Sequence, residues 1–275
     1  MSIMVGDVDW NQLWMEEMSK TSWSRLHGQG AGFWDERAKQ LDEQRRWNQE
    51  TTARILAWLD LDPSCRVMDI GAGPGTLTIP LSKVSKHITA VEPSREMRFY
   101  LNKFAREEGV SNITCIEKRW EDVTPFEDAD EHDVVIASHS LLMKDLKAAL
   151  AKMGQLASRS VHLISFAGVG DGCYQELWKS LYGEEYRAGP DYIYLYNILY
   201  DMGIYADLEV WDVDYRQPFA CLEDAVRLWA SNLGASSPEA EEIVRSILSR
   251  RIVAEDGYYL LKSRMKWSLI SWTPE

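Results

Sequence analysis

Two acidic residues stand at the ends of two apolar runs, and a glycine-rich loop follows the first of them. Residues 67–76 have the sequence VMDIGAGPGT, in which Asp69 stands near the end of an apolar run and glycine occupies every second position from Gly71 to Gly75. The next apolar run, ITAV, ends at Glu92. Glycines at this spacing allow a tight turn and let a ligand approach the backbone, because no Cβ stands in the way.

The position of the two acids restricts the ligand that this loop can bind. Neighbouring parallel strands end at one edge of a sheet, where open α/β sheets bind their ligands, so we expect Asp69 and Glu92 to meet there. The loop differs from the dinucleotide fingerprint Gly-x-Gly-x-x-Gly, because Thr76 takes the place of the third glycine. The Asp69 carboxylate would also repel a pyrophosphate, whereas it suits a ligand that carries an amino group.

The pattern Asp-x-Gly-x-Gly-x-Gly resembles motif I of the class I S-adenosylmethionine-dependent methyltransferases. The resemblance implies a Rossmann-like sheet, S-adenosylmethionine as cofactor with S-adenosylhomocysteine as its product, and in-line transfer of the methyl group. In that family the first acid and the loop hold the methionine part, and the acid after the second strand binds the ribose. The residues that the resemblance assigns to this part of the cofactor site are Asp69, Gly71, Ala72, Gly73, Gly75, Glu92 and Pro93.

Two later segments supply the remaining candidate site residues. After the third predicted strand come Trp120, Glu121 and Asp122, where the family places an acid on the adenine amino group; the Trp120 ring is expected along the base. An acid here can also cap the next helical turn. After the fourth strand come Ser138 and His139, in the segment that approaches the methyl group in the family. His139 is the candidate general base, since imidazole titrates near neutral pH, and the alternative is that it lines the pocket.

The sequence offers no pattern for a metal centre. The four cysteines are scattered and the five histidines lack the spacing of metal ligands. Residues 138–140 read SHS, without the Asp that holds a metal in catechol-type methyltransferases. The Asn/Asp-Pro-Pro-aromatic motif of enzymes that methylate adenine amino groups is absent as well. We therefore expect no metal, and amino-group chemistry on adenine loses its support.

Charge and composition restrict the partners. A net charge of −13 weighs against nucleic acid as substrate, because polyanion binding depends on Lys and Arg. No segment approaches the ~20 apolar residues that span a bilayer. The first residues do not resemble a secretory signal, so we expect a cytoplasmic protein that acts on a small molecule. The alternatives are a tRNA or protein acceptor, a non-catalytic S-adenosylmethionine-binding protein and a nicotinamide oxidoreductase.

The alternation of strand and helix patterns predicts an α/β fold with a seven-stranded, mostly parallel, doubly wound sheet and an antiparallel edge strand. We expect an N-terminal helical cap or lid in residues 1–60 and a Rossmann-like cofactor-binding core in residues 61–170. Residues 171–275 would complete the sheet and add helical insertions on the substrate side. The predicted strands are 66–70, 88–91, 112–117, 133–137, 161–166, 206–215 and 258–272, and the main predicted helices are 51–59, 94–108, 146–156, two within 171–202 and two within 222–251.

Aromatic residues outside the core leave two interpretations open. Trp10 and Trp14 recur at helical spacing before a joint with several glycines at residues 27–32, and Trp34 follows that joint. They either dock a helical face on the core or wall a substrate pocket as part of a lid. The tyrosines at positions 192, 194 and 196 either line an aromatic pocket or pack in the core.

Overall fold

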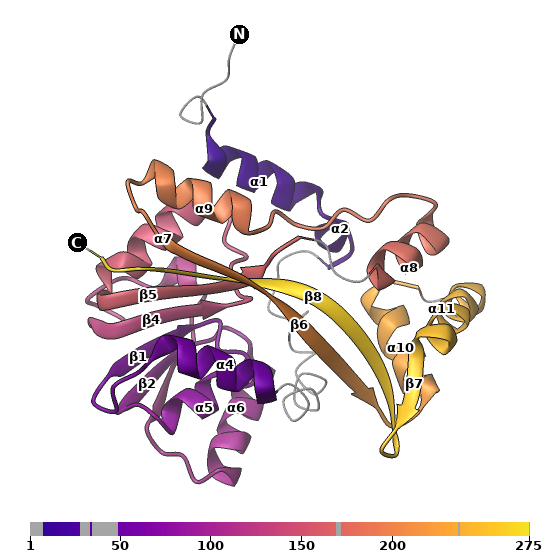
Figure 1. The fold of residues 1–275 in the computed structure, drawn as a ribbon, viewed down its shortest axis with the longest axis horizontal. Coiled ribbons are helices and arrows are strands. Elements are labelled where there is room, and N and C mark those ends of the chain that lie inside the picture. Colours follow the sequence, from indigo (N-terminus) through magenta and orange to yellow (C-terminus); the bar gives the residue numbers. More distant parts are fainter. Residues whose placement is uncertain (1–7, 28–33, 35–48, 169–171, 236, 275) are drawn as a thin grey trace.

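A computed structural model of the chain describes residues 8–27, 34, 49–168, 172–235 and 237–274. It shows a mixed sheet with helices on both faces (Figure 1). None of the described helices has the length and apolarity needed to cross a membrane. In chain order the elements are α1 (Trp10–Lys20), α2 (Ser22–His27), α4 (Gln49–Leu59), β1 (Arg66–Ile70), α5 (Thr78–Ser82), β2 (His87–Val91), α6 (Arg95–Glu107), β3 (Ile113–Ile116), the 3₁₀ turn η2 (Trp120–Asp122), β4 (His132–Ser138), α7 (Leu146–Gln155), β5 (Ala157–Phe166), α8 (Cys173–Tyr182), α9 (Tyr192–Asp201), β6 (Asp207–Phe219), α10 (Leu222–Asn232), α11 (Pro238–Arg251), β7 (Ile252–Glu255) and β8 (Tyr258–Trp272).

The strand order is that of a doubly wound sheet. Strands run in the order β3-β2-β1-β4-β5-β8-β6, and β7 pairs with the outer part of β8. Strands β1 to β5 are parallel, whereas β8 is antiparallel to both β5 and β6. All seven predicted strands are present, and β7 is an additional strand that the sequence did not predict. The order reverses between β1 and β4, and ligands of such sheets bind outside the carboxyl ends of the strands at this point.

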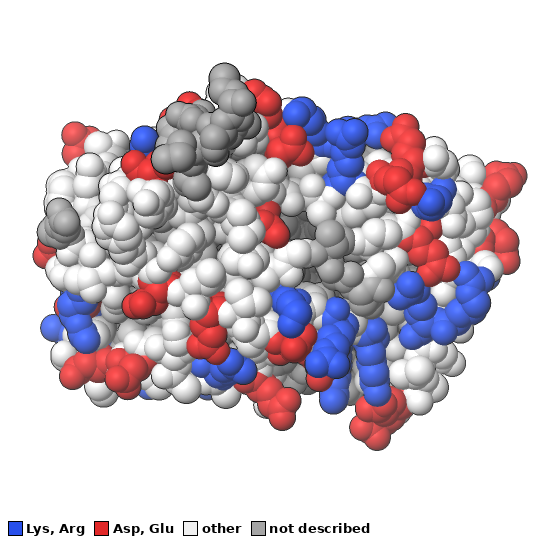
Figure 2. Space-filling view, turned by 45° about the horizontal axis from the view of Figure 1, so that its top comes forward, with Lys and Arg blue, Asp and Glu red and all other residues white. Residues whose placement is uncertain are grey.

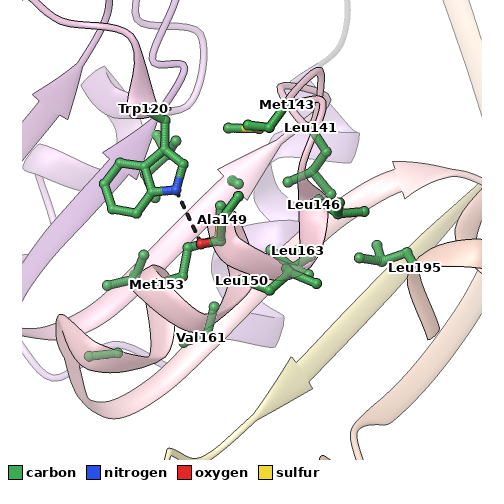
Figure 3. Packing of buried hydrophobic residues seen from close by; sticks show 14 of the residues in the cluster. Trp120, Leu141, Met143, Leu146, Ala149, Leu150, Met153, Val161, Leu163 and Leu195 are labelled. Atoms are coloured by element: carbon green, nitrogen blue, oxygen red, sulfur yellow. Dashed lines mark hydrogen bonds between the residues drawn. The ribbon is translucent and has the colours of Figure 1, made fainter. Parts of the chain in front are cut away.

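Alternating side chains of the central strands pack into two cores. Val67 and Ile136 pack with residues of α4 and α5, whereas Met68 and Val135 pack in the cluster that contains α1, α7 and α9. Figure 1 shows these two sets of helices on opposite faces of the sheet. Because both faces are covered, the strands are nearly continuous apolar runs, as in other parallel sheets. The apolar stripe predicted in residues 146–156 lies on α7 and packs against β5 (Figure 3).

Capping residues place the starts of two helices close to the carboxyl edge of the sheet. The Ser94 hydroxyl accepts a hydrogen bond from the Met97 amide at 3.1 Å and begins α6. The Asp145 carboxylate accepts one from the Ala148 amide at 3.0 Å and begins α7. Such caps are worth about 1 kcal/mol each. They fix the loops after β2 and β4 between a strand and a helix.

Strands β6 and β8 extend beyond the rest of the sheet. Phe166, the last residue of β5, pairs with Trp267, whereas β6 and β8 remain paired as far as Phe219 and Tyr259. Because β5 ends there at its carboxyl end, the extension projects from the carboxyl edge of the parallel strands. Figure 1 shows α8, α10, α11 and β7 gathered around its far end.

A separate apolar cluster holds these helices on the extension. Trp178 of α8, Trp229 of α10 and Leu248 of α11 pack with Phe219 of β6 and Leu261 of β8. The helices predicted within residues 222–251 are α10 and α11. The chain then returns through the β7–β8 hairpin. Its two-residue loop, residues 256–257, has φ angles of 51° and 81°, which Asp-Gly adopts readily in such turns.

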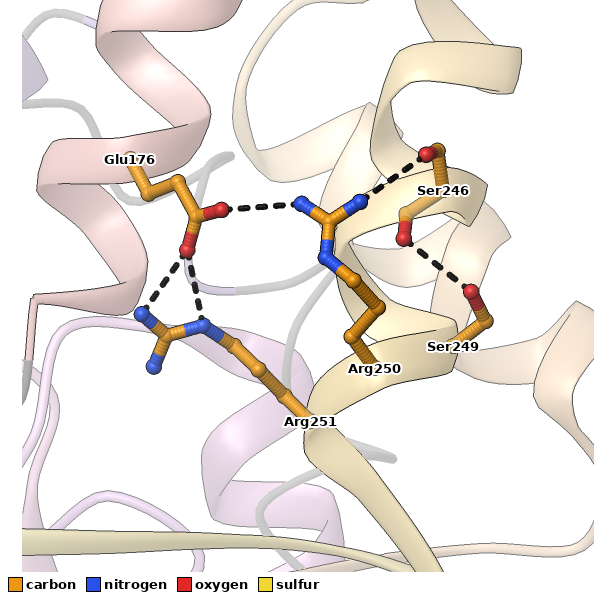
Figure 4. Close-up of polar contacts among 5 residues, drawn as sticks. All are labelled: Glu176, Ser246, Ser249, Arg250 and Arg251. Atoms are coloured by element: carbon orange, nitrogen blue, oxygen red, sulfur yellow. Dashed lines mark hydrogen bonds and ion pairs between the residues drawn. The ribbon is translucent and has the colours of Figure 1, made fainter.

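A charged cluster connects α8 to the end of α11. One oxygen of Glu176 accepts hydrogen bonds from Arg251 at 2.8 and 3.0 Å, and the other accepts one from Arg250 at 2.9 Å (Figure 4). Arg250 also donates to the Ser246 hydroxyl at 3.2 Å. The pairs are partly exposed, so we expect them to contribute little to the free energy of unfolding and mainly to align the two helices.

Helix α1 is docked on the core next to the loop that follows β4. The Trp14 indole donates a hydrogen bond of 3.0 Å to the Met143 carbonyl, and the Asn11 amide bonds Asp145 at 3.1 Å. Trp14 and Met18 are buried. These contacts support docking for α1. Most of the glycine joint and of the segment after it, residues 28–33 and 35–48, lies outside the described residues.

Candidate active site at the carboxyl edge

The carboxyl ends of β1, β2 and β4 bring three of the candidate residues to one edge of the sheet. Asp69 stands next to last in β1, Glu92 directly follows β2, and Ser138 ends β4. Strand β1 pairs with both β2 and β4, so these positions are neighbours across the sheet. The expected meeting of the two acids at one edge is therefore confirmed as a feature of the fold.

Asp69 is a buried carboxyl group. Its side chain is 2% exposed, and Oδ2 accepts a hydrogen bond of 2.6 Å from the Thr78 hydroxyl of α5. Burial raises the pKa of Asp69 to about 6; the hydrogen bond from Thr78 opposes this shift and the nearby Glu92 carboxylate adds to it. A cation that approaches this group favours its ionised form.

Glu92 joins the glycine loop to the start of α6. Its Oε2 accepts a hydrogen bond of 2.8 Å from the Gly73 amide, and its Oε1 accepts one of 2.8 Å from the Ser94 amide. The backbone at this turn is held by Arg98, which donates to the carbonyl oxygens of Glu92 and Pro93 at 2.8 and 2.7 Å. The carboxylate is thus positioned rigidly beside the loop.

Glycine is required in the loop for two different reasons. Gly71 has a φ of 72°, and a Cβ on it would lie 2.3 Å from the Cβ of Ser140 in the loop after β4. The Ser140 hydroxyl donates a 2.5 Å hydrogen bond to the Ile70 carbonyl, so the two loops are in direct contact. Gly73 has a φ of 55°, and no described atom lies within 4 Å of the place that its Cβ would take. The loop is therefore tight at Gly71 and open at Gly73.

His139 adopts an unusual backbone conformation directly after β4. Its φ is 52°, in the left-handed region that few residues other than glycine adopt, and its amide donates to the Ile164 carbonyl at 2.9 Å. Its ring centroid lies 4.4 Å from that of Phe166 and 4.2 Å from that of Trp267. Left-handed residues of this kind are frequent at active sites, where the surrounding structure holds them in place.

The two ring nitrogens of His139 are buried and, within the part of the chain that the structure describes, make no hydrogen bonds. Burial lowers the pKa of His139 to about 4, so the ring is neutral at pH 7. A neutral imidazole has one nitrogen that donates and one that accepts. Buried polar atoms without partners are rare, and a bound ligand is one way to supply the partner.

The segment after β3 lies on η2 and the turn around it. The Trp120 ring is 3% exposed and its nitrogen donates to the Ala149 carbonyl at 3.2 Å (Figure 3). Lys152 fixes the turn by donating to the carbonyl oxygens of Trp120 and Val123 at 2.8 and 2.7 Å. The side chains of Glu121 and Asp122 are exposed. Their contact with adenine, and that of the Trp120 ring, stays a prediction.

The other aromatic candidates pack between helices. The rings of Trp10 and Tyr194 meet edge to face with centroids 5.9 Å apart, which joins α1 to α9. The Tyr196 hydroxyl donates to the Ala206 carbonyl at 3.0 Å. Tyr192, Tyr194 and Tyr196 all pack against the core cluster that contains α7. These contacts favour core packing over a pocket wall.

Three further residues at this edge were not among the site residues predicted from the sequence. Thr78 bonds Asp69, Ser140 closes over Gly71, and Trp267 packs on His139. Thr78 follows the glycine loop closely, so a hydroxyl near the start of the helix was the available signal. Trp267 had no local signal, because its position depends on the antiparallel register of β8 with β5.

A comparison with models of protein families identifies the domain that contains this edge of the sheet. Residues 67–159, which run from β1 into β5, match the family model described as a methyltransferase domain. These residues form a class I S-adenosylmethionine-dependent methyltransferase domain. The cofactor of this methyltransferase is accordingly S-adenosylmethionine. In the described part of the chain, no three His, Cys, Asp or Glu side chains gather in a way that would hold a metal ion.

Individual relatives of the methyltransferase are distant. An "Uncharacterized protein" of Haemophilus influenzae is 27% identical over 252 residues, which cover 87% of this chain and 88% of that protein. The magnesium protoporphyrin IX methyltransferase of Synechocystis PCC 6803, solved with bound SAH, is 18% identical with a TM-score of 0.51 and covers 95% of this chain and 99% of its own; this likeness concerns the fold. A 45-residue stretch is 49% identical to the 23S rRNA (uracil(1939)-C(5))-methyltransferase RlmD of Erwinia tasmaniensis, covering 16% of this chain and 10% of that enzyme.

Proposed function

We propose that this methyltransferase transfers the methyl group of S-adenosylmethionine to a small molecule and holds the cofactor beside Asp69 and Glu92. The observation that carries this proposal is the hydrogen bond of 2.8 Å from the Gly73 amide to the Glu92 carboxylate. It places an acid that can accept from ribose hydroxyls next to a backbone position with open space where a Cβ would stand. These features fit a nucleoside lying across the loop.

Each part of the cofactor has candidate residues at this edge. The buried Asp69 carboxyl group, whose pKa of about 6 is open to lowering by a cation, suits the cofactor's ammonium group. When bound, the cofactor supplies a methyl group that is activated on a sulfonium. The proposed contacts of the methionine part are Asp69, Gly71, Ala72, Gly73 and Gly75. The proposed contacts of the ribose are Glu92 and Pro93, and those of the adenine are Trp120, Glu121 and Asp122. Ser138, which ends β4, is proposed to lie beside the methyl group of the cofactor.

Positioning is expected to supply much of the catalysis. Holding two reacting groups in near-attack geometry lowers a barrier by up to ~7–11 kcal/mol in well-oriented cases. His139 is the proposed general base, because its neutral ring keeps one nitrogen free to accept a proton. A base is needed only when the acceptor arrives protonated, so loss of His139 should slow the reaction rather than abolish it.

Surface charge favours a small molecule over a nucleic acid. The exposed cations of β8 are Lys262, Arg264 and Lys266, and each of them contacts a carboxylate of Glu255 or Asp212. Figure 2 shows basic side chains lying beside acidic ones on the face that it presents. Cations that are already paired release few counterions on binding phosphate, which limits affinity for a polyanion. The short match to an rRNA methyltransferase keeps RNA as the second candidate.

Three parts of the chain have separate proposed roles, and the last of them lies where the acceptor would bind, beside the carboxyl edge of the sheet. We propose residues 1–60 as a cap, residues 61–170 as the cofactor-binding core and residues 171–275 as the part that completes the sheet and contacts the acceptor. Support comes from the β6–β8 extension, which projects from the edge where Asp69 and Glu92 lie and carries α10 and α11.

Methyl transfer from cofactor labelled in its methyl group tests this proposal. The purified protein is incubated with a cell extract that has been separated into metabolites below about 1 kDa, RNA and protein, and label is counted in each fraction. We expect label among the metabolites together with release of S-adenosylhomocysteine. Label in RNA or protein would favour the corresponding alternative. Binding of S-adenosylhomocysteine without transfer to any fraction would favour a non-catalytic protein.

A further inference from the structure

An aromatic cluster lies at the carboxyl edge of β5 and β8. Trp267 of β8 is paired in register with Phe166 of β5 on one side and Trp211 of β6 on the other. The Trp267 and Trp211 rings meet edge to face with centroids 5.8 Å apart. The His139 ring lies against both Phe166 and Trp267, at 4.4 and 4.2 Å. Phe166 is 49% exposed, so the cluster is open to solvent at this end.

Two side chains in this cluster have buried polar atoms without partners. Both ring nitrogens of His139 and the indole nitrogen of Trp267 lack a hydrogen bond within the described chain. The indole nitrogens of Trp10, Trp178 and Trp229 lack one too, but those rings pack between helices. The His139–Trp267 pair differs because the two unpartnered side chains are in ring contact at an edge where this fold binds ligands.

The pair adjoins the proposed cofactor site. His139 directly precedes Ser140, whose hydroxyl bonds the carbonyl of Ile70 at 2.5 Å. A Cβ on Gly71 would lie 2.3 Å from the Ser140 Cβ. His139 is therefore one residue away from the contact between the loop after β4 and the glycine loop. A group bound at its ring lies on the side of the glycine loop toward β5 and β8.

The free hydrogen-bonding atoms define the group that fits. The indole of Trp267 can only donate, and the neutral His139 ring offers one acceptor nitrogen. A hydroxyl satisfies both, since it donates to His139 and accepts from Trp267. Arg54, which stacks over Trp211, is already paired with Glu209, so it offers no free charge to an anionic acceptor. The exposed ring of Phe166 suits a planar, uncharged body.

We propose that His139 and Trp267 together bind the hydroxyl of a planar, uncharged acceptor and that this enzyme is an O-methyltransferase. The inference deepens the proposed function and rests on it. In the reaction the acceptor oxygen forms a bond to the methyl carbon while the carbon–sulfur bond breaks and its electron pair stays on sulfur. The hydroxyl proton passes to the acceptor nitrogen of His139. Trp267 keeps its proton and positions the oxygen.

Binding of phenol and anisole to the 275-residue protein, saturated with S-adenosylhomocysteine, tests the pair. Anisole has the same ring as phenol but no hydroxyl proton, so it cannot donate to His139. We expect phenol to bind about fivefold more tightly than anisole, the effect of one net hydrogen bond. Phenol should also shift one tryptophan indole signal in a ¹⁵N-labelled sample, and this signal should be absent from Trp267→Phe.

Three variants test whether the preference for phenol over anisole depends on His139 and Trp267. Trp267→Phe should bind phenol no more tightly than anisole, and His139→Asn, which tolerates the left-handed backbone, should lower the phenol preference as well. Trp229→Phe, whose indole nitrogen is also unpartnered but lies in the cluster of α8, α10 and α11, should keep the preference.

Three results would overturn the inference: no phenol binding, equal affinity for phenol and anisole, or a phenol preference that persists without the Trp267 indole. Failure of the proposed function is visible beforehand as a lack of S-adenosylhomocysteine binding. The two failures are therefore distinguishable.

Discussion

The Glu92 carboxylate accepts a hydrogen bond of 2.8 Å from the Gly73 amide, nineteen residues earlier in the chain. Its other oxygen bonds the Ser94 amide at the start of α6. One side chain thus connects the loop after β1, the end of β2 and a helix start. This arrangement makes Glu92 the most direct point at which to alter cofactor binding without removing an apolar core residue.

Glu92→Ala should weaken binding of S-adenosylhomocysteine strongly while the protein stays folded. The variant loses a charged acceptor, and hydrogen bonds to charged groups are worth about 1.5–3 kcal/mol each, or roughly ten- to hundredfold in Kd. Calorimetric titration measures the change. Glu107→Ala, at the far end of α6, serves as the control and should bind as the parent does. Unchanged affinity in Glu92→Ala would remove the ribose assignment.

Alanine substitutions at two glycines of the loop and at Gly109, which follows α6, should separate backbone strain from steric conflict. Gly73→Ala and Gly109→Ala place a Cβ in open space at a positive φ, so each should lower the free energy of unfolding by about 1–2 kcal/mol. Gly71→Ala adds a conflict with Ser140, and overpacking costs a further ~1–3 kcal/mol. Urea unfolding gives the three values.

Two of these variants also test the cofactor position. Gly73→Ala should reduce S-adenosylhomocysteine affinity, because its Cβ enters the space proposed for the ligand, whereas Gly109→Ala should not. Equal affinity in these two variants would place the cofactor elsewhere.

Asp69 should make the cofactor-free protein less stable as pH rises. Its pKa is raised from 3.8 to about 6 in the folded chain, mainly by burial. Between these values the folded state keeps a proton that the unfolded chain has lost, so the free energy of unfolding falls by up to about 3 kcal/mol as pH rises through this range. Asp69→Asn removes the titration. Its stability advantage over the parent should therefore be larger at pH 7.5 than at pH 4.5, and an equal difference at both pH values would contradict the argument.

His139 should matter for turnover and little for cofactor binding. His139→Asn keeps a residue that tolerates a φ of 52° but removes the ring, so kcat should fall by about 10²–10⁴-fold if the ring acts as a base. Burial lowers the pKa of His139 to about 4. The kcat of the parent should therefore fall only as the pH approaches 4, where the ring becomes protonated. S-adenosylhomocysteine should bind the variant and the parent equally. An unaltered kcat would leave His139 as a residue that lines the pocket.

Local patterns in the sequence were sufficient for the parallel part of the sheet and for its two acids. Strands β1, β2 and β4 are buried on both faces and are therefore nearly continuous apolar runs, which is why Asp69 and Glu92 could be assigned to strand ends. The caps at Ser94 and Asp145 likewise act over a few residues. The seven expected strands and the helices after residue 171 followed from the same kind of local signal.

Features that depend on pairing between distant segments could not be predicted. Strand β6 runs four residues further than expected, to Phe219, because it is paired with β8 along its whole length. Strand β7 has four residues, none of them fully buried, and only its Asp-Gly turn gave a signal that was overlooked. The meeting of His139 with Trp267 required the register between β5 and β8. The residues that would decide acceptor chemistry are of this second kind.

A crystal structure of the complex with S-adenosylhomocysteine tests the central claim most directly. The account predicts that the two ribose hydroxyls lie within hydrogen-bond distance of the Glu92 carboxylate, with the amino-acid part of the ligand beside Asp69 and Gly73. A ligand bound away from these two acids, or a site that takes NADH in its place, would contradict it.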